Sequence, residues 1–363
     1  MVTVNTETAL SIFKGKKVFV TGHTGFKGSW LITWLGLLEA QIMGYALPPD
    51  NSESIYNRVN GDKICESVFA DVRDKEQLQQ EIQNFQPDFV FHLAAQPLVR
   101  ASYADPLGTY DVNVMGTANL LNAIRLVKKS CSVVIITTDK VYENNEWAYP
   151  YREVDRLGGY DPYSASKACT EIVLDSFRRS FFNPAKLDDH GISIASARAG
   201  NVIGGGDWSV DRIIPDIVRN LTLDQPIPIR NPGAIRPWQH VLEPIYGYLL
   251  LAYRLYTDPL KYSGAYNFGP YPTDVLSVDQ LALKAIELWG KGSVVLPDTS
   301  TQPHEARILK LDIAKTIDHL NWTPKLNSVE AIEWTVNWYK QPKEKQNDFT
   351  LQQIRDYHHL NEI

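Results

Sequence analysis

Short apolar runs alternate with segments of helical periodicity through the first half of the chain. The run at 18–21 is β-branched and aromatic, and apolar residues follow it at helical spacing from Trp30 to Leu38. The same alternation predicts strands at 41–47, 88–93, 133–136 and 192–197, a further strand that ends before Asp71, and a helix at 75–85. Strands that alternate with helices favour a parallel, doubly wound sheet with right-handed crossovers. The pattern therefore predicts the α/β fold class.

The pattern changes after residue 201. Prolines follow one another at short intervals, and five arginines lie from Arg198 to Arg236. The later periodicity predicts helices at 106–129, 242–256, 277–289 and 328–339, and strands at 265–269 and 294–296. We expect a first domain at 1–201 to which 237–270 returns, and a smaller mixed α/β substrate lobe at 202–236 and 271–341. Residues 342–363 are expected to form a polar tail or a surface helix.

Composition narrows the classes of function. The chain has 363 residues, a formal net charge of −6 and no long basic run, so nucleic acid is not an expected partner. No apolar run approaches the roughly 20 residues that span a bilayer, and the first residues do not form a secretory signal, so we expect no membrane partner and a cytoplasmic location. Cys65, Cys131 and Cys169 match neither a metal site nor a disulfide framework. We therefore expect reduced thiols and no metal.

Three glycines at intervals of three, Gly22, Gly25 and Gly28, connect the first predicted strand to the first predicted helix. Such a turn places a pyrophosphate against free backbone N–H groups and the positive end of the helix dipole. The sequence therefore predicts a Rossmann-like dinucleotide-binding domain. Contacts to the dinucleotide are expected along the glycine turn and the later strand ends, at Gly22, Thr24, Gly25, Phe26, Lys27, Gly28, Asp71, Val72, Leu93, Ala94, Ala95, Gln96, Asn113 and Thr137.

The sequence leaves the roles of three polar residues near this predicted site, Asp50, His92 and Asn113, less specific. The second strand runs into prolines before Asp50, so this region leaves both NAD and NADP open. His92 lies within the strand at 88–93 without a metal-ligand partner at suitable spacing, so a core histidine is expected. Asn113 interrupts the apolar stripe of the helix at 106–129, which indicates either a capped bend or a side chain that hydrogen-bonds from within the helix.

Tyr163 and Lys167 lie four residues apart at the start of a predicted helix, after the strand at 133–136. This spacing places them on one face. A tyrosine is a poor base at neutral pH, but a nearby ammonium and a cationic nicotinamide ring stabilise its phenolate. The lysine can also hydrogen-bond the ribose of the dinucleotide. The pattern is common on helix surfaces, and the dinucleotide-binding context favours hydride transfer from an alcohol.

The motifs TGHTGFKG, HLAAQ, TTDKVY, YSASK and RAGNVIGGGDW, in this order, resemble the extended short-chain dehydrogenase/reductase family over about 16–341. Within that family, GHTGFKGSWL, TDKVYENNEW, RPWQHVLEP and QPHEA closely resemble the CDP-glucose 4,6-dehydratases of bacterial dideoxysugar and O-antigen (lipopolysaccharide) biosynthesis. The resemblance implies NAD as cofactor and a nucleotide sugar, CDP-glucose, as substrate. It also implies a homodimer or homotetramer that pairs through helices at 111–128 and 163–182.

The resemblance also assigns roles around the TTDKVY stretch. Tyr163 takes the proton of the sugar 4-hydroxyl, with Thr138 hydrogen-bonded alongside, while the cofactor takes the hydride from C4. Asp139 is the acid and Lys140 the base that remove water across C5 and C6, before the hydride returns to C6. Lys140 must then be neutral and Asp139 protonated, which requires burial or charged neighbours. Epimerases of the family usually have a serine and small residues here, and an exposed ion-paired turn is the alternative interpretation.

The expected substrate contacts lie mostly in the second lobe. Arg236 of RPWQHV matches the diphosphate-binding arginine of the family, and guanidinium groups suit phosphate oxygens. Cytosine contacts remain open, as do a dehydratase or 4-epimerase for another nucleotide sugar and a non-catalytic dinucleotide-binding homologue. The candidate substrate-binding set is Gln96, Thr138, Asn201, Arg212, Arg236, Trp238 and His304, with Trp208 and Glu305 as further candidates to frame the base or sugar.

Overall fold

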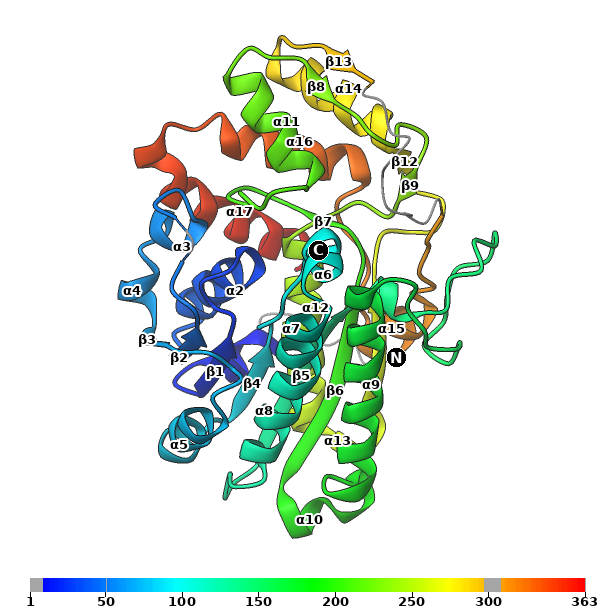
Figure 1. Cartoon of the computed structure of the whole chain (residues 1–363). Coiled ribbons are helices and arrows are strands. Elements are labelled where there is room, and N and C mark those ends of the chain that lie inside the picture. The colour runs from blue at the N-terminus through cyan, green and yellow to red at the C-terminus, as the bar shows by residue number, and fades with distance from the viewer. Residues whose placement is uncertain (1–8, 50, 297–307, 363) are drawn as a thin grey trace.

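A seven-stranded parallel sheet forms the centre of the molecule in the computed structural model, which describes residues 9–49, 51–296 and 308–362 (Figure 1). The strand order is β11-β6-β5-β4-β1-β2-β3, so the order reverses between β1 and β4. The predicted α/β class with a doubly wound sheet is confirmed. The strands are β1 Lys17–Thr21, β2 Gln41–Ala46, β3 Glu66–Phe69, β4 Phe89–His92, β5 Cys131–Thr138, β6 Ile192–Ala199 and β11 Gly264–Phe268.

Successive side chains of β5 point to opposite faces of the sheet. Val133 and Ile135 pack in a core with residues of α5 (Lys75–Phe85), α8 (Gly116–Ile124) and α9 (Pro162–Ser180). Val134 and Ile136 pack in a second core with residues of α2 (Phe26–Leu37) and α12 (Leu242–Thr257). All eight residues of β5 are buried, which explains the unbroken apolar run in the sequence.

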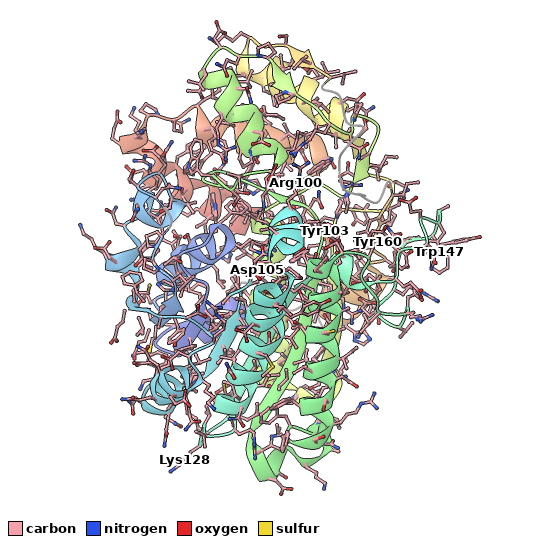
Figure 2. All side chains as sticks on the ribbon, in the orientation of Figure 1. Arg100, Tyr103, Asp105, Lys128, Trp147 and Tyr160 are labelled. Atoms are coloured by element: carbon pink, nitrogen blue, oxygen red, sulfur yellow. The ribbon has the colours of Figure 1, made fainter. Side chains whose placement is uncertain are left out.

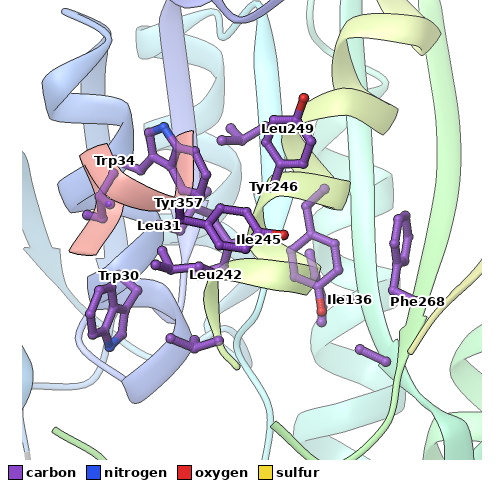
Figure 3. Close-up of a cluster of buried hydrophobic side chains, with 14 of the residues drawn as sticks. Trp30, Leu31, Trp34, Ile136, Leu242, Ile245, Tyr246, Leu249, Phe268 and Tyr357 are labelled. Atoms are coloured by element: carbon purple, nitrogen blue, oxygen red, sulfur yellow. The ribbon is translucent and has the colours of Figure 1, made fainter. Parts of the chain in front are cut away.

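The second core includes the C-terminal helix α17, Gln346–Leu360 (Figure 3). The ring of Trp34 lies 5.9 Å from that of Tyr246 and 6.0 Å from that of Tyr357, between ring centroids. The side chain of Glu243 on α12 accepts hydrogen bonds from the Tyr357 hydroxyl at 2.6 Å and from two backbone N–H groups at 325–326. The segment at 342–363, expected as a polar tail or surface helix, thus contains a helix with a buried face.

The second lobe lies beyond the carboxyl ends of the strands (Figure 1). It contains α11, α14 and α16, and three pairs of two-residue strands connect its loops. Helix α16 has the predicted bounds, and α14 begins one residue later than predicted. The bounds are α11 Ile213–Thr222, α14 Val278–Trp289 and α16 Ser328–Tyr339, with strand pairs β7 Val202–Ile203 and β10 Gln239–His240, β9 Ile235–Arg236 and β12 Leu276–Ser277, and β8 Ile227–Pro228 and β13 Val294–Val295.

The prediction of a single helix at 106–129 is wrong in detail. This stretch consists of α7 (Pro106–Tyr110), a π-helical segment Asp111–Met115 and α8, which ends at Ile124. The π-helical segment carries Asn113, whose side chain bonds outside the helix. The remaining short helices are α3 Ile55–Arg58, α4 Gly61–Ile64, α6 Val99–Ala104, α10 Leu187–His190, α13 Pro259–Tyr262 and α15 Ala314–Leu320. In the described ranges, no helix is both long and apolar enough to cross a bilayer.

Candidate active site

A cavity of about 760 Å³ opens at the carboxyl ends of the strands, where the strand order reverses. Open α/β sheets bind ligands at this point. The glycine turn, the ends of β4, β5 and β6, the start of α9 and the second lobe all contribute to its wall. The predicted site residues that line it are Gly22, Thr24, Gly25, Phe26, Lys27, Gly28, Asp71, Val72, Leu93, Ala94, Ala95, Thr137, Thr138, Lys140, Tyr163, Lys167, Asn201, Arg212, Arg236 and Trp238.

The glycine turn is packed too closely for side chains at two positions. Gly22 has φ +73°, and a Cβ there would lie 2.7 Å from the backbone nitrogen of Ala94. A Cβ on Gly28 would lie 2.1 Å from the Gly22 carbonyl oxygen. Gly25 is the N-cap of α2, so the first N–H groups of that helix are free to bind an anion at the cavity wall. This geometry fits the pyrophosphate of a dinucleotide.

Lys27 lies on the first turn of α2 and lines the same cavity. Burial, together with the charges of Arg212 and Lys167, lowers the pKa of Lys27 to about 7, while the charge of Asp139 acts in the opposite direction. The cavity therefore concentrates positive charge between the glycine turn and the second lobe, which favours a ligand with phosphate groups.

Helix α9 presents Tyr163 and Lys167 on its first turns. Asp161 caps the helix by accepting from the Ser164 N–H at 2.9 Å, and Pro162 takes the first helical position. The Tyr163 N–H donates to Ser102 Oγ at 3.1 Å, which fixes the start of α9 against α6. The predicted pair is therefore held in one place, with both side chains buried and facing the cavity.

Burial shifts the pKa values of this pair in opposite directions. Burial raises the pKa of Tyr163 to about 12, against the hydrogen bond with Thr138 and the charge of Arg212. Burial lowers the pKa of Lys167 to about 8, and Glu171, one turn further along α9, opposes that decrease. The Lys167 ammonium donates to the Ile136 carbonyl at 3.3 Å, which ties α9 to β5. Tyr163 needs a further positive charge nearby to act as a base.

The TTDKVY stretch forms the end of β5 and a 3₁₀ turn, Asp139–Val141. Thr138 Oγ1 donates to Asp139 Oδ1 at 2.9 Å, and Lys140 Nζ lies 3.7 Å from the same oxygen. The side chain of Asp139 is 1% exposed and that of Lys140 is 33% exposed. A carboxyl and an amine thus lie next to Tyr163, and the alternative of an exposed turn does not fit the burial of Asp139.

The second oxygen of Asp139 has an unusual environment. Asp139 Oδ2 is buried and has no hydrogen-bond partner within 9–49, 51–296 and 308–362. A Cβ on Gly200 would lie 3.3 Å from this oxygen and 2.9 Å from Pro237 Cγ, so the loop after β6 covers it closely. Buried oxygens without a partner are rare, and they occur at catalytic sites.

The second lobe brings guanidinium groups to the other wall of the cavity. Arg212 Nη1 lies 3.1 Å from Asp207 Oδ2, and Arg236 Nη1 donates to the Ile235 carbonyl at 3.0 Å. The indole N–H of Trp238 donates to the Leu276 carbonyl at 3.0 Å. Arg100 on α6 lies between the two parts of the molecule (Figure 2), 3.6 Å from Asp211. The cavity is thus closed on the lobe side by charged groups that suit a diphosphate.

Several predicted residues do not line the cavity. Asp139 is buried within the turn, and Gln96 and Asn113 support the loop after β4. Asn113 Oδ1 accepts from the Gln96 N–H at 2.9 Å, and its Nδ2 donates to Ser166 Oγ at 2.8 Å, so Asn113 hydrogen-bonds from within the helix. The Gln96 side chain accepts from the Leu98 N–H at 2.6 Å. His304, Glu305 and Asp50 lie outside the described residues.

His92 is a core histidine, as predicted. Its Nδ1 lies 2.7 Å from Thr21 Oγ1 and its Nε2 lies 3.0 Å from Thr117 Oγ1. Burial lowers the pKa of His92 to about 3, so the ring stays neutral. Both ring nitrogens are used to join β1, β4 and α8.

Sequence reasoning missed two arginines that line the cavity and an ion pair behind it. Arg73 lines the cavity and pairs with Asp71 at 2.7 Å, and Arg230 lines it from β8's end and pairs with Asp211 at 2.9 Å. Arg73 directly follows the predicted Val72, but no motif distinguishes either arginine. Glu171 and Arg198 form a buried ion pair behind the site. The spacing of Glu171 from Lys167, one helical turn, was the available signal.

The arrangement brings Tyr163 and Lys167, Asp139 and Lys140, and the arginines of the second lobe together around one cavity. The family model for GDP-mannose 4,6-dehydratase matches residues 19–335. The chain belongs to this family. Its predicted resemblance to the dehydratases and epimerases of the extended short-chain dehydrogenase/reductase group is confirmed.

Among the curated relatives of this chain, CDP-glucose 4,6-dehydratase from Salmonella typhimurium is 50% identical over 330 residues, 91% of this chain and 92% of that protein. A dTDP-glucose 4,6-dehydratase from Streptomyces antibioticus is 29% identical over 335 residues, 89% of this chain and 92% of that protein. Among solved structures, DesIV, a dTDP-glucose 4,6-dehydratase from Streptomyces venezuelae with NAD and TYD bound, has a TM-score of 0.73 at 22% identity, covering 92% of this chain and 99% of that one. This likeness shows the shared fold.

Proposed function

We propose that the chain is a CDP-glucose 4,6-dehydratase, an NAD-dependent hydro-lyase that converts CDP-glucose to CDP-4-keto-6-deoxyglucose. The observation that carries the proposal is the position of Asp139 and Lys140 at the end of β5, next to Tyr163. A 4-epimerase needs only the hydride-transfer pair, whereas loss of water also needs an acid and a base. The 50% identity to the Salmonella typhimurium enzyme supports CDP-glucose as the substrate.

The residues around the cavity fit NAD. The free N–H groups at the start of α2 suit the pyrophosphate, and the small residues Ala94 and Ala95 at the end of β4 leave room for a flat ring system. Asp71 lines the cavity past the end of β3, where an acidic side chain suits a ribose hydroxyl. Bound NAD supplies the hydride acceptor for C4, the hydride donor for C6 and, when oxidised, a positive charge beside Tyr163.

Tyr163 and Thr138 hold the 4-hydroxyl, and Tyr163 takes its proton as the C4–H bond breaks. Lys167 stabilises the phenolate through its ammonium group. The ketone at C4 then acidifies the C5–H bond, and Lys140 removes that proton. Asp139 gives a proton to the 6-hydroxyl, which leaves as water and yields a C5–C6 double bond. Lys140 then returns its proton to C5 as C6 receives the hydride, which completes the 4-keto-6-deoxy product.

The second lobe is proposed to bind the nucleotide diphosphate. Arg236 and Arg212 line the cavity and would contact the diphosphate, and Asn201 and Trp238 line it nearby. The charge of Arg212 also acts on Tyr163, which supports a diphosphate position close to the sugar. The Gln96 side chain would act through the loop after β4, because it does not line the cavity.

A substrate panel tests the proposal. Purified protein with NAD is incubated with CDP-, dTDP-, UDP- and GDP-glucose, and the 4-keto product is measured by its absorbance in base. We expect product from CDP-glucose at a rate at least about tenfold above the others. If another nucleotide sugar gave the 4-keto product instead, that sugar would be assigned as the substrate. An epimerised sugar without a 4-keto product would indicate an epimerase, and no change in any sugar would indicate a non-catalytic dinucleotide-binding protein.

We further propose a homo-oligomer that pairs through α8 and α9. These helices lie side by side on one face (Figure 1) and, with the adjoining turns, expose Met115, Ile172 and Phe181, which are 51%, 59% and 44% exposed. Light scattering should give at least twice the 41.1 kDa chain mass, and Ile172→Glu should reduce it. We also propose a cytoplasmic role in dideoxysugar and O-antigen biosynthesis, since the 4-keto-6-deoxy product suits further deoxygenation.

A further inference from the structure

A buried ion pair lies directly behind the two catalytic segments. Glu171 on α9 and Arg198 on β6 each have side chains that are 4% exposed, and Arg198 Nη2 lies 2.9 Å from Glu171 Oε2. Arg198 Nε also donates to Glu171 Oε1 at 3.0 Å, so the contact is bidentate. Neither residue lines the cavity. Removing both charges from water is unfavourable, so an ion pair at this depth is weak evidence for a role in stability alone.

The pair holds both ends of the TTDKVY stretch. Thr137, which precedes the turn at 139–140, donates its hydroxyl to Glu171 Oε1 at 2.6 Å. Arg198 Nη1 donates to the hydroxyl of Tyr142, which follows that turn, at 2.9 Å. The turn with the proposed acid and base is therefore fixed on both sides by one bidentate pair.

The outer partners of the pair are themselves fixed. Ser196 Oγ donates to Glu171 Oε2 at 2.7 Å, and the Tyr142 hydroxyl donates to Asn267 Oδ1 at 2.6 Å. The network thus reaches from α9 through β6 to β11. Burial acts against ionisation of Glu171, yet Arg198 and the hydrogen bonds from neighbouring hydroxyls hold the pKa of this carboxyl below its ordinary value. Glu171 therefore carries a fixed negative charge.

That negative charge also acts on the hydride-transfer pair. Glu171 lies one helical turn after Lys167, which lies one turn after Tyr163. The Lys167 ammonium faces Glu171 on α9, Lys27 on α2 and His92 on β4, and among these three Glu171 carries the negative charge. One carboxylate thus contacts the strand that carries the elimination groups and stabilises the charge of the lysine that supports oxidation.

We propose that Glu171 and Arg198 are positioning residues that hold Asp139 and Lys140 in register with Tyr163 and Lys167. Neither residue contacts the substrate. The pair acts by fixing Thr137 and Tyr142 and by the charge that Glu171 places beside Lys167. This inference deepens the proposed function and rests on it.

The test compares Glu171→Gln with Tyr142→Phe, both nearly isosteric. For Glu171→Gln we expect kcat to fall about 10- to 100-fold, because a small misplacement of catalytic groups has effects of this size. The KM for CDP-glucose should change less than about threefold, since the removed contacts are not to the substrate. The alkaline limb of the pH profile should move to lower pH, because Lys167 loses a stabilising negative charge. Tyr142→Phe should lower kcat and leave that limb in place.

A double variant, Glu171→Gln with Arg198→Met, separates positioning from folding. It removes both buried charges, so its melting temperature should exceed that of Glu171→Gln. Its kcat and alkaline limb should stay like those of Glu171→Gln. Wild-type kcat with an unchanged alkaline limb in either variant would overturn the proposal, even if the melting temperature falls. All rates are compared with the wild type on the same substrate, so an inactive wild type counts against the proposed function and not against the positioning role.

Discussion

Lys140 lines the cavity, whereas its neighbour Asp139 is buried beside it and does not, with Lys140 Nζ 3.7 Å from Asp139 Oδ1. The two residues therefore have different access to a substrate. Lys140 can approach a carbon-bound proton directly. Asp139 adjoins the site: Thr138 donates to its Oδ1, and its Oδ2 has no partner among the described residues.

Removing either group should separate oxidation from loss of water. Lys140→Met and Asp139→Asn should each lower the rate of product formation by about 10²- to 10⁴-fold, the usual contribution of a general acid or base. Oxidation at C4 should continue, so absorbance of the reduced cofactor at 340 nm should increase in a single turnover. Lys63→Met, at an exposed lysine, serves as the control. Near wild-type formation of product by either variant would refute the assignment.

The alkaline limb of activity should report Lys167. Burial lowers the pKa of Lys167 to about 8, so its ammonium is present below that pH and is lost above it. Without this charge the Tyr163 phenolate is less stable, and kcat/KM should fall as the pH rises through about 8. The measurement is a pH–rate profile of the free enzyme at low substrate concentration. A flat profile up to about pH 10, the ordinary range for a lysine, would show that Lys167 is not perturbed in this way.

Much of the fold follows from periodicity in the sequence. The helix at 328–339 was predicted with its observed bounds, because its apolar residues recur at helical spacing within one short stretch. The apolar run at 133–136 predicted β5 for the same local reason. By contrast, the π-helical segment around Asn113 depends on hydrogen bonds to Gln96 and Ser166, which lie elsewhere in the chain.

The site shows the same division between features that local sequence predicts and features that depend on contacts from elsewhere in the chain. Motifs located Tyr163, Lys167 and the TTDKVY stretch, since each is a short pattern at a strand end or a helix start. They did not reveal the burial of Asp139, because Gly200, which packs closely over it, lies far from it in the sequence. Nor did they reveal the role of the C-terminal helix, because Tyr357 meets Glu243 only in the folded chain.

The effect of the close packing of Gly200 against Asp139 can be tested by adding one carbon atom at Gly200. In Gly200→Ala, the new Cβ would lie 3.3 Å from Asp139 Oδ2 and 2.9 Å from Pro237 Cγ, so the loop or the carboxyl must shift. We expect the rate of water loss to fall about 10- to 100-fold. Gly233→Ala is the matched control, because a Cβ there meets no atom within 4 Å. Equal rates in the two variants would mean that the cover does not position Asp139.

The contact between α12 and α17 should make stability depend on pH. Burial raises the pKa of Glu243 from 4.5 to about 7, so its contribution to stability is fully present below pH 4.5 and is lost as the pH rises through about 7. Glu243→Gln can keep the hydrogen bonds to Tyr357 and to the backbone at 325–326 without ionising. Its free energy of unfolding, relative to the wild type, should therefore increase with pH across this range, by up to about 1.4 kcal/mol per pH unit.

Urea unfolding at several pH values measures this difference, and Glu333→Gln, at an exposed glutamate, provides the comparison. The exposed variant should follow the wild type at every pH. If the curves of Glu243→Gln and the wild type also stay parallel, Glu243 does not titrate in the folded protein within this range.

The path of one hydrogen atom tests the central claim most directly. CDP-glucose labelled with deuterium at C4 is converted by the enzyme with unlabelled NAD, and the position of the label is determined by NMR and mass spectrometry. Oxidation at C4, loss of water and return of the same hydride predict deuterium at C6 of the 4-keto-6-deoxy product. Deuterium that remains at C4 of an epimerised sugar, or a dehydrated product without label at C6, would contradict the account.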